Sequence, residues 1–309
     1  MATLADQTPG SIVKIKENGS LTNFLVLCND YPVTGKALLR RQVAYTGIAW
    51  STVNNEYSGS NIDNWCTNTY FAMLDPDFQP LISDVAIQSC TGGGTFQVRT
   101  LNRKIFLLSY TELNCPSNAY APVEGSPISY FSSNSQRIAT LNGSPVHWWT
   151  RSPYMLGGDN IWYIKTDGTA SNSYMNNGRG VLPCFTLPST IQVGSDGSLI
   201  PNIPPSPPAQ INVPSSAMAF SPISITWSAS TDPEGESVSY VLERSVNSQA
   251  YTQVYSGAQT QYSDTFSYPC SVIYRVKAVD ESGGESAYTQ SSAVSILMDY
   301  SNVVIGGDI

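Results

Sequence analysis

Few residue types in this sequence could carry out catalysis. His147 is the single histidine, so any Ser-His or Cys-His nucleophile would depend on that one side chain, and no GxSxG motif is present. Neighbouring acids occur only where turns are predicted, and turn acids are usually solvated: Asp75 with Asp77, Glu234 with Glu236, and Asp280 with Glu281. We therefore predict no catalytic residues and a protein that is not an enzyme.

Potential metal ligands are also too scattered to predict a metal site. No CxxC pair occurs among the six cysteines, which are Cys28, Cys66, Cys90, Cys115, Cys184 and Cys270. We expect buried free thiols at these positions, and neither a metal nor a cofactor. Calcium stays open as an alternative, because Asp159, Asn160 and Asp167 lie in predicted loops, although the EF-hand spacing is missing.

The segment from His147 to Leu187 has the composition of a recognition surface. Tryptophan and tyrosine alternate there with many Asn, Ser and Gly residues, and such aromatics provide a large contact area at a low cost in side-chain entropy. Trp148, Trp149 and Trp162 lie in or beside predicted strands, so each could be buried or exposed. The predicted ligand-binding residues are Tyr154, Met155, Asp159, Asn160, Trp162, Asn172, Tyr174, Asn176, Asn177 and Arg179.

Predicted strands position this segment. A hairpin is expected from 161–165 and 171–175 around the Asp167-Gly168 turn, followed by a closing apolar strand over 180–187. At the start of the chain, alternating apolar residues around the Asn18-Gly19 turn predict a first hairpin over 13–28. Further strands are predicted at 37–39, 85–87 and 104–108.

One long helix is predicted, from a Ser60 N-cap with Asp63 as its capping-box partner to the Asp75-Pro76 break. Its apolar stripe would pack on a sheet and consists of Ile62, Trp65, Cys66, Tyr70, Ala72 and Met73. A shorter helix is expected over 77–83, a brief helix after a second capping box at Ser109 and Glu112, and a long loop over 115–135. Two helices among many short strands predict an α+β domain.

The C-terminal part predicts a second, all-β domain. Prolines between Pro188 and Pro214 are typical of an extended spacer, which we place at 200–214. After it, Ile223, Ile225 and Trp227 alternate with polar residues, as do Tyr274, Val276 and Ala278. In TWSASTDPEG and YRVKAVDESGGES the region 215–297 resembles a fibronectin type III domain, which implies an immunoglobulin-like sandwich. Residues 298–309 form a tail without a predicted role.

Charge and composition exclude some partners. The formal net charge is −8, so a phosphate backbone or an anionic membrane would repel the chain, and we expect neither nucleic acid binding nor membrane insertion. The N-terminus has no apolar segment typical of a signal peptide, and no apolar run is long enough to span a membrane. We therefore expect synthesis in a cytoplasm.

Three motifs carry a resemblance to a known family. KIFLLSYTEL (104–113), RIATLNGSPVHWWTRSP (137–153) and GRGVLPCFTLPS (178–189) resemble an uncharacterised domain common in prophages of Gram-positive gut bacteria. That domain is similar to the C-type-lectin-like fold of sulfatase-modifying factors and of retroelement variable proteins. The resemblance covers about residues 8–199 and implies a C-type-lectin-like recognition domain at 1–199, with ligand contacts over 154–179.

Some properties of these relatives do not carry over. The chain has Leu182 and Cys184 where the family's closing strand usually has Arg and Ala, and it lacks the EPN and WND motifs of calcium-dependent sugar binding. It also lacks the cysteine pair of the formylglycine-generating enzymes, so their copper-dependent oxidase activity is not implied.

The sequence thus leads to a hypothesis of a non-enzymatic virion protein of a phage or a tail-like particle. It would assemble with other virion proteins, as a homo-oligomer, and bind a host-surface glycan or protein. The first alternative is a structural decoration or fibre protein whose aromatic face packs on neighbouring subunits. The second is a degenerate enzyme of the sulfatase-modifying type.

Overall fold

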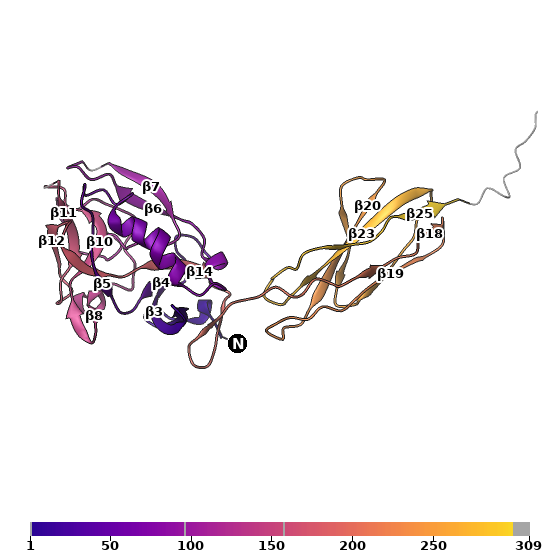
Figure 1. The fold of residues 1–309 in the computed structure, drawn as a ribbon, viewed down its shortest axis with the longest axis horizontal. Helices are drawn as coiled ribbons and strands as arrows, with labels where there is room; N and C mark the ends of the chain where they lie inside the picture. The colour runs from indigo at the N-terminus through magenta and orange to yellow at the C-terminus, as the bar shows by residue number, and fades with distance from the viewer. Residues whose placement is uncertain (1, 96, 157, 299–309) are drawn as a thin grey trace, which may run out of the picture. The chain divides into compact units, whose positions relative to one another are not determined.

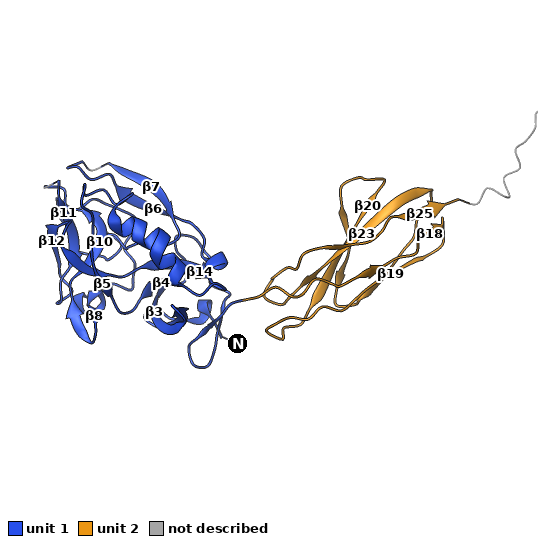
Figure 2. Cartoon of the chain, in the orientation of Figure 1, with its two compact units in different colours: residues 1–201 blue, residues 202–309 orange. Residues whose placement is uncertain are grey.

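The computed structural model describes residues 2–95, 97–156 and 158–298, which form two compact units, 1–201 and 202–309 (Figure 2). Most of the regular structure is strand, and no helix among the described residues is long and apolar enough to cross a membrane. The predicted tail, 298–309, falls outside the described residues except for Met298.

A four-stranded antiparallel sheet forms one part of the first unit (Figure 1). The predicted first hairpin is confirmed, because β2 pairs with β3 across Asn18 and Gly19, both of which have positive φ. The predicted strand at 37–39 is confirmed within β4. In order across the sheet the strands are β14 (Cys184–Pro188), β4 (Lys36–Arg41), β3 (Ser20–Cys28) and β2 (Ile12–Glu17).

A five-stranded sheet carries the recognition segment. The hairpin at the Asp167-Gly168 turn is confirmed, with Ile161 opposite Ser173. The predicted single strand over 180–187 is wrong, because Pro183 has no N–H for a ladder and the chain leaves this sheet there for the four-stranded one. In order the strands are β12 (Ala170–Tyr174), β11 (Asn160–Ile164), β10 (Trp148–Pro153), β13 (Gly178–Val181) and β5 (Tyr45–Ala49).

The predicted helix is present, but its middle is a π-helix. It runs through α1 (Asn61–Asn64), the π segment η2 (Trp65–Tyr70) and α2 (Phe71–Met73). Ser60 is the N-cap, and its side chain accepts a hydrogen bond from the backbone N–H of Asp63. The wider π turn rotates the apolar stripe, so Tyr70 is buried while Ala72, which we expected to pack inward, is exposed.

The expected short helix over 77–83 is a 3-10 turn, and the strand at 85–87 is confirmed within a hairpin. Residues 105–108 are buried as expected, but they form only one bridge, Phe106 to Cys184, instead of a strand. The remaining elements of the unit are β1 (Ala2–Thr3), η1 (Leu4–Asp6), η3 (Gln79–Leu81), β6 (Val85–Cys90), β7 (Val98–Arg103), η4 (Asn134–Arg137), β8 (Ala139–Leu141), β9 (Ser144–Val146), β15 (Gln192–Val193) and β16 (Leu199–Ile200).

The second unit is a β-sandwich, as predicted. Ile225 and Trp227 face Leu242, Tyr274 and other residues of one apolar core. One sheet has the order β17 (Ile211–Asn212), β19 (Ile223–Trp227), β22 (Gln261–Asp264). The other has the order β18 (Ser216–Met218), β25 (Val294–Leu297), β23 (Cys270–Val279), β20 (Ser239–Val246), β21 (Thr252–Gly257), and β24 (Thr289–Gln290) also pairs with β23.

The proline-rich stretch that we expected to be a spacer at 200–214 belongs to the sandwich. Ile211 pairs with Trp227 in β17, and the carbonyl oxygen of Pro208 accepts a hydrogen bond from the Thr289 hydroxyl. Pro205 and Pro208 are buried. Proline suits an extended edge segment, because its missing N–H can face away from the ladder, so the spacer prediction is wrong.

Replacement of Trp227 by alanine is expected to destabilise the sandwich by about 3 to 5 kcal/mol, because the indole fills the core between Tyr240 and Tyr255. Urea unfolding of the full chain would measure this loss. Tyr268→Ala is the control at an exposed position of the same unit, and it should change stability by less than about 0.5 kcal/mol. Equal effects of both substitutions would contradict the packing role.

Candidate ligand-binding surfaces

The β11–β12 hairpin separates the predicted contact residues onto two faces of the five-stranded sheet. Residues directly opposite each other in an antiparallel pair point to the same side. Asn160 lies opposite Tyr174, and Trp162 lies opposite Asn172, so these four share one face. Residue 163 points to the other face, because side chains alternate along a strand.

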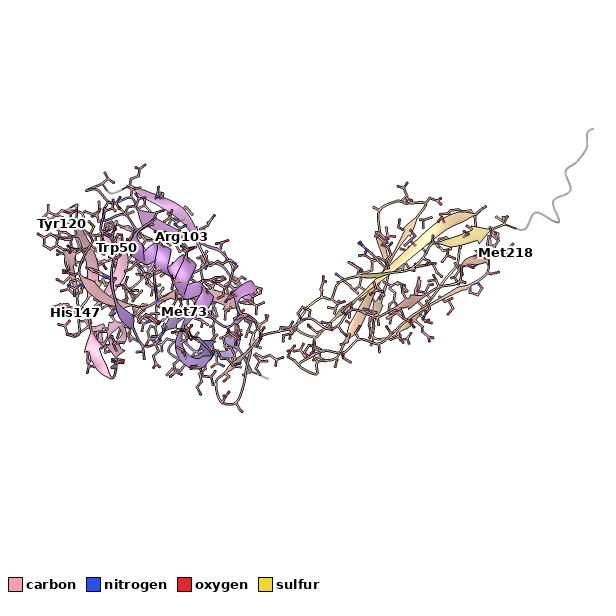
Figure 3. The ribbon with its side chains drawn as sticks, viewed as in Figure 1. Trp50, Met73, Arg103, Tyr120, His147 and Met218 are labelled. Carbon is pink, nitrogen blue, oxygen red and sulfur yellow. The ribbon has the colours of Figure 1, made fainter. Side chains whose placement is uncertain are left out.

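The first of these surfaces, which we call the aromatic–amide face, consists of Tyr120, Tyr154, Asn160, Trp162, Asn172 and Tyr174. The Tyr154 ring packs edge-on against Trp162 at 5.1 Å between centroids, and Tyr120 lies 5.5 Å from Tyr154. Tyr174 is 65% exposed and Tyr120 is 41% exposed. Tyr120 lies at the edge of the first unit in Figure 3. Aromatic rings therefore line a surface that solvent can reach.

An amide pair completes this face. The Nδ2 of Asn160 donates to the Oδ1 of Asn172 at 3.1 Å, while the Oδ1 of Asn160 is buried and has no hydrogen-bond partner. A buried acceptor without a partner costs about 1 to 3 kcal/mol.

Two predicted contact residues are buried. Met155 is 6% exposed, and its Sδ lies 3.8 Å from the Sγ of Cys90. Trp162 is 4% exposed, because Tyr110 covers its ring at 4.6 Å and the indole N–H donates to the carbonyl oxygen of Tyr120. We therefore assign Met155 to the protein interior, and Trp162 is the base on which Tyr154 packs.

The remaining predicted contact residues lie outside the aromatic–amide face. Asp159 and Asn176 are exposed, and neither belongs to the aromatic cluster. Asn177 donates from Nδ2 to the hydroxyl of Ser173, which is on the opposite side of the hairpin from Trp162. Arg179 lies over the Tyr163 ring and so faces that second side.

Tyr120 and Tyr110 were not among the predicted contact residues. Both lie outside the recognition segment, and Tyr120 belongs to the long loop over 115–135, where no periodic pattern reports which side chains point outward. The loop is held to the hairpin by a backbone hydrogen bond from Met155 to Tyr120. Together with the indole N–H of Trp162, which donates to the same carbonyl oxygen, this long-range contact brings Tyr120 to the face.

A buried ion pair joins two of the sequence motifs in the first unit. Arg151 of WWTRSP donates from Nη1 and Nη2 to both carboxylate oxygens of Glu112 of SYTE, at 2.6 and 2.7 Å. Both side chains are almost completely buried. The expected capping box is confirmed, because the backbone N–H of Ser109 donates to Glu112 and the Ser109 hydroxyl accepts from the N–H of Glu112. The brief helix expected to follow it is wrong, because residues 110–114 form only a turn.

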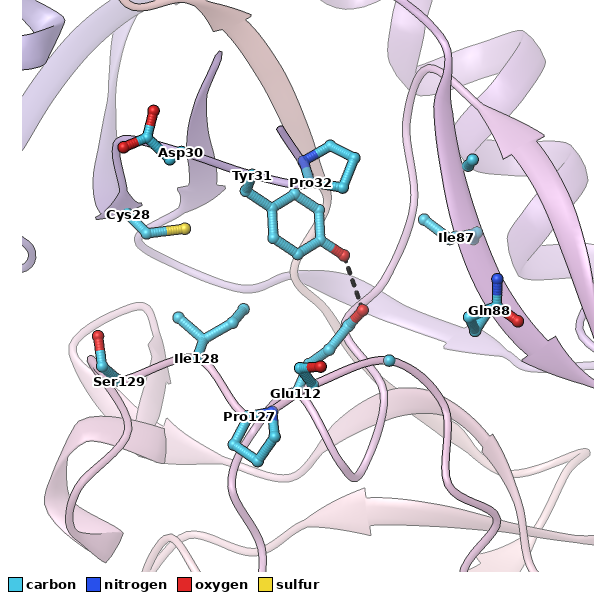
Figure 4. A pocket seen from close by; sticks show the side chains of 13 residues that line it. Cys28, Asp30, Tyr31, Pro32, Ile87, Gln88, Glu112, Pro127, Ile128 and Ser129 are labelled. Carbon is cyan, nitrogen blue, oxygen red and sulfur yellow. Dashed lines mark hydrogen bonds between the residues drawn. The ribbon is translucent and has the colours of Figure 1, made fainter. Parts of the chain in front are cut away.

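A pocket of about 450 Å³ opens beside this pair (Figure 4). The Tyr31 hydroxyl donates to Glu112 at its base, at 2.7 Å, and burial together with Glu112 raises the pKa of Tyr31. The two oxygens of Glu112 already accept hydrogen bonds from Arg151, Tyr31 and the Ser109 N–H, so the base offers no free carboxylate. We therefore assign the Glu112 side chain a structural role.

A second buried acid, Glu124, is held without a direct cation partner. Its carboxylate accepts hydrogen bonds from the backbone N–H of Cys90 and the hydroxyl of Ser152. Burial raises the pKa of Glu124 above its ordinary value.

The cysteines are free thiols, and Cys66, Cys90 and Cys184 are buried while Cys28, Cys115 and Cys270 are half-buried. Within 2–95, 97–156 and 158–298 no three His, Cys, Asp or Glu side chains are placed to hold a metal ion.

Residues 34–189, which include the five-stranded sheet, β4 and β14 of the four-stranded sheet and the motifs above, match the family described as "Domain of unknown function (DUF6273)". The chain belongs to this family. The family's description assigns no activity to the DUF6273 domain. No curated protein matches the chain in sequence.

Solved structures show only distant likeness. The fibronectin(III)-like modules of Clostridium thermocellum CbhA match with 14% identity and a TM-score of 0.24, over 48% of this chain and 65% of that one. The FN1-FN3 domains of chicken CNTN1 match with 13% identity and a TM-score of 0.25, over 40% and 48%. The PKD domain of an M14-like peptidase from Thermoplasmatales archaeon SCGC AB-540-F20 matches with 21% identity and a TM-score of 0.25, over 31% and 97%. The sandwich assignment therefore depends on the strand pairing described above.

Glu124→Gln is expected to change how the stability of the DUF6273 domain depends on pH. The pKa of Glu124 is raised in the folded state above its ordinary value of 4.5, so the folded chain binds more protons and loses stability as pH rises from about 4.5 through the folded pKa. Glutamine stays neutral, so the variant should gain stability relative to the parent over that window. Urea unfolding between pH 4 and pH 8 would measure the difference.

The matched control is Glu281→Gln, at an exposed position of the second unit. Its stability should follow the parent's at every pH. Parallel curves for the parent and Glu124→Gln would contradict the buried-acid assignment.

Proposed function

We propose that this chain is a non-enzymatic binding protein displayed on a phage or phage-tail-like particle, and that its aromatic–amide face contacts a host-surface glycan or protein. The observation that carries the proposal is the cluster of Tyr120, Tyr154 and Tyr174 beside the Asn160–Asn172 amide pair. Its rings are partly exposed, and one buried amide oxygen has no partner.

The chemistry of this face suits either kind of ligand. Tyrosine has an apolar ring for packing and a hydroxyl for hydrogen bonding, and it has only two side-chain torsions to immobilise on binding. Tyr154 is already fixed by Trp162 and Tyr120, so less entropy is lost when a ligand packs on it. The face carries no charged side chain, which favours a neutral contact surface.

The resemblance of the SYTEL, WWTRSP and GVLPCFTLP segments to a prophage-encoded domain supports the virion assignment. It also supports a finer fold proposal, a C-type-lectin-like first unit and a fibronectin type III second unit. In such a particle many copies could act together, and weak contacts at each face would add up through a high effective concentration. Other virion proteins and further copies of this chain would be its structural partners.

A structural decoration protein is the second candidate. The second unit exposes Met218, Phe220 and Leu297, and Met218 lies directly opposite Leu297 in the sheet. Phe220 has a positive φ of 66°, which is unfavourable for a bulky residue. An exposed apolar group of this kind favours packing against a neighbouring subunit.

The double substitution Tyr174→Ala and Asn176→Ala should weaken attachment at least about tenfold while changing the thermal midpoint little, because both residues are exposed. Binding of the labelled full chain to whole Gram-positive gut bacteria and to their purified wall glycans would measure attachment. Tyr268→Ala is the control, an exposed tyrosine of the second unit. Asn176 lies outside the aromatic–amide face, so Tyr174→Ala is also measured alone, and undiminished attachment of that single variant would rule out the face as the contact site.

Location on the particle has a separate test. A gold-labelled antibody to this chain should decorate purified particles at regular positions in electron micrographs. Labelling outward from the particle surface supports recognition, whereas labelling that appears only after the particle is disrupted supports the structural candidate. Particles without any label would refute both.

A further inference from the structure

The second face of the β11–β12 hairpin gathers positive charge on aromatic rings. Trp149 lies opposite Tyr163, and Tyr163 lies opposite Ser171, so all three point to this side. His147 directly precedes β10 and packs against Tyr163, and Lys165 directly follows β11 and lies near His147, so both border this side. We call this surface, together with Arg179 of β13, the arginine–tyrosine face.

Arg179 is held in place by rings. Its guanidinium carbon lies 3.5 Å from the centroid of Tyr163 and 5.1 Å from that of Trp149. The His147 ring packs edge-on against the Tyr163 ring, with 5.3 Å between their centroids. Cation–π contacts of this kind fix the plane of a guanidinium before any ligand arrives.

The charge of Arg179 is not neutralised by an acid. Among the described residues it forms no ion pair, and its buried Nε donates to no acceptor. Lys165 adds a second cation, partly offset by Asp167 at 3.5 Å. His147 is exposed, and partial desolvation together with the charge of Arg179 lowers its pKa.

This local charge contrasts with the chain as a whole. The protein has a net charge of −8. Among the described residues, the other arginines either pair with an acid, as Arg103 does with Asp63, or are buried, as Arg40 and Arg137 are. A guanidinium without an acid partner on a half-exposed surface is available to an anionic ligand, and Arg binds planar oxyanions through two parallel N–H donors.

We propose that the arginine–tyrosine face binds an oxyanion of an acidic surface glycan, either a carboxylate or a phosphate. Arg179 supplies the charge and the paired donors, Lys165 adds attraction, and the hydroxyls of Ser171 and Ser173 lie on the same face as further polar partners. The inference rests on the proposed function in one respect, since it names the ligand class for the opposite side of the same hairpin.

The test uses the full chain and three polymer probes. Polysialic acid presents carboxylates, wall teichoic acid presents phosphates, and dextran is neutral. Calorimetric titration should show binding of at least one acidic polymer that weakens as salt rises from 50 to 300 mM, and no binding of dextran. Binding to only one acidic polymer identifies the oxyanion. Failure to bind either acidic polymer, or equal binding of dextran, would overturn the proposal.

Arg179→Met retains much of the packing on Tyr163 and removes the charge. Its affinity for the acidic polymer should be lower than the parent's by at least a factor of about ten, which is about 1.4 kcal/mol. The affinity of Arg179→Lys should fall between those of the parent and the methionine variant. Arg99→Met is the matched control, a half-exposed arginine of the same unit on β7. Equal affinity of Arg179→Met and the parent would overturn the proposal, as would an equal loss in Arg99→Met.

The two proposed binding faces can be tested independently of each other. If each face acts by itself, the Tyr174→Ala and Asn176→Ala variant should still bind the acidic polymer but lose attachment to cells. If that variant loses polymer binding to the same degree as Arg179→Met, the assignment of the oxyanion site to Arg179 is overturned. Normal polymer binding by a parent protein that attaches to no cells would leave the oxyanion site standing and refute the proposed function.

Discussion

The buried ion pair between Arg151 and Glu112 is the contact on which the first unit depends. Arg151 also donates to the backbone carbonyl oxygens of Gln88 and Leu107, so one side chain ties β10 to β6 and to the segment before the capping box. Removing two charges from water is costly, and the pair is stable only because all of these acceptors are satisfied together. The hairpin that carries both candidate faces starts directly after this strand.

Three arginines of the first unit show how the surroundings of a guanidinium determine whether it has a structural role or can bind a ligand. Arg151 is buried and saturated, which suits a structural role. Arg40 is also buried, between the rings of Phe131 and Trp148 at 5.7 and 5.6 Å, yet its Nε and Nη1 have no acceptor, and burial lowers its pKa. Arg179 is held by rings as well but lies on a half-exposed surface. Only in this last setting can a ligand from outside reach the guanidinium.

Much of the local structure could be predicted from single residues. Asn18-Gly19 and Asp167-Gly168 mark their turns because Gly accepts positive φ, and Ser60 and Ser109 mark caps because their hydroxyls accept or donate to backbone groups. Prediction failed where a nonlocal partner decides. The π segment shifted the helix stripe, and Pro183 divided one expected strand between two sheets.

The candidate site shows the same division. Composition predicted a recognition surface over His147–Leu187, because aromatic and amide side chains suit contact, and the family resemblance narrowed the prediction to Tyr154–Arg179. Only the tertiary structure decided that Met155 and Trp162 are covered, that Tyr120 joins from a distant loop, and that Arg179 faces the opposite side from Trp162. Turn and cap preferences act within a few residues, whereas burial and the face of a sheet depend on which strand lies alongside. That pairing joins residues far apart in the chain, and the sequence pattern of one strand does not report it.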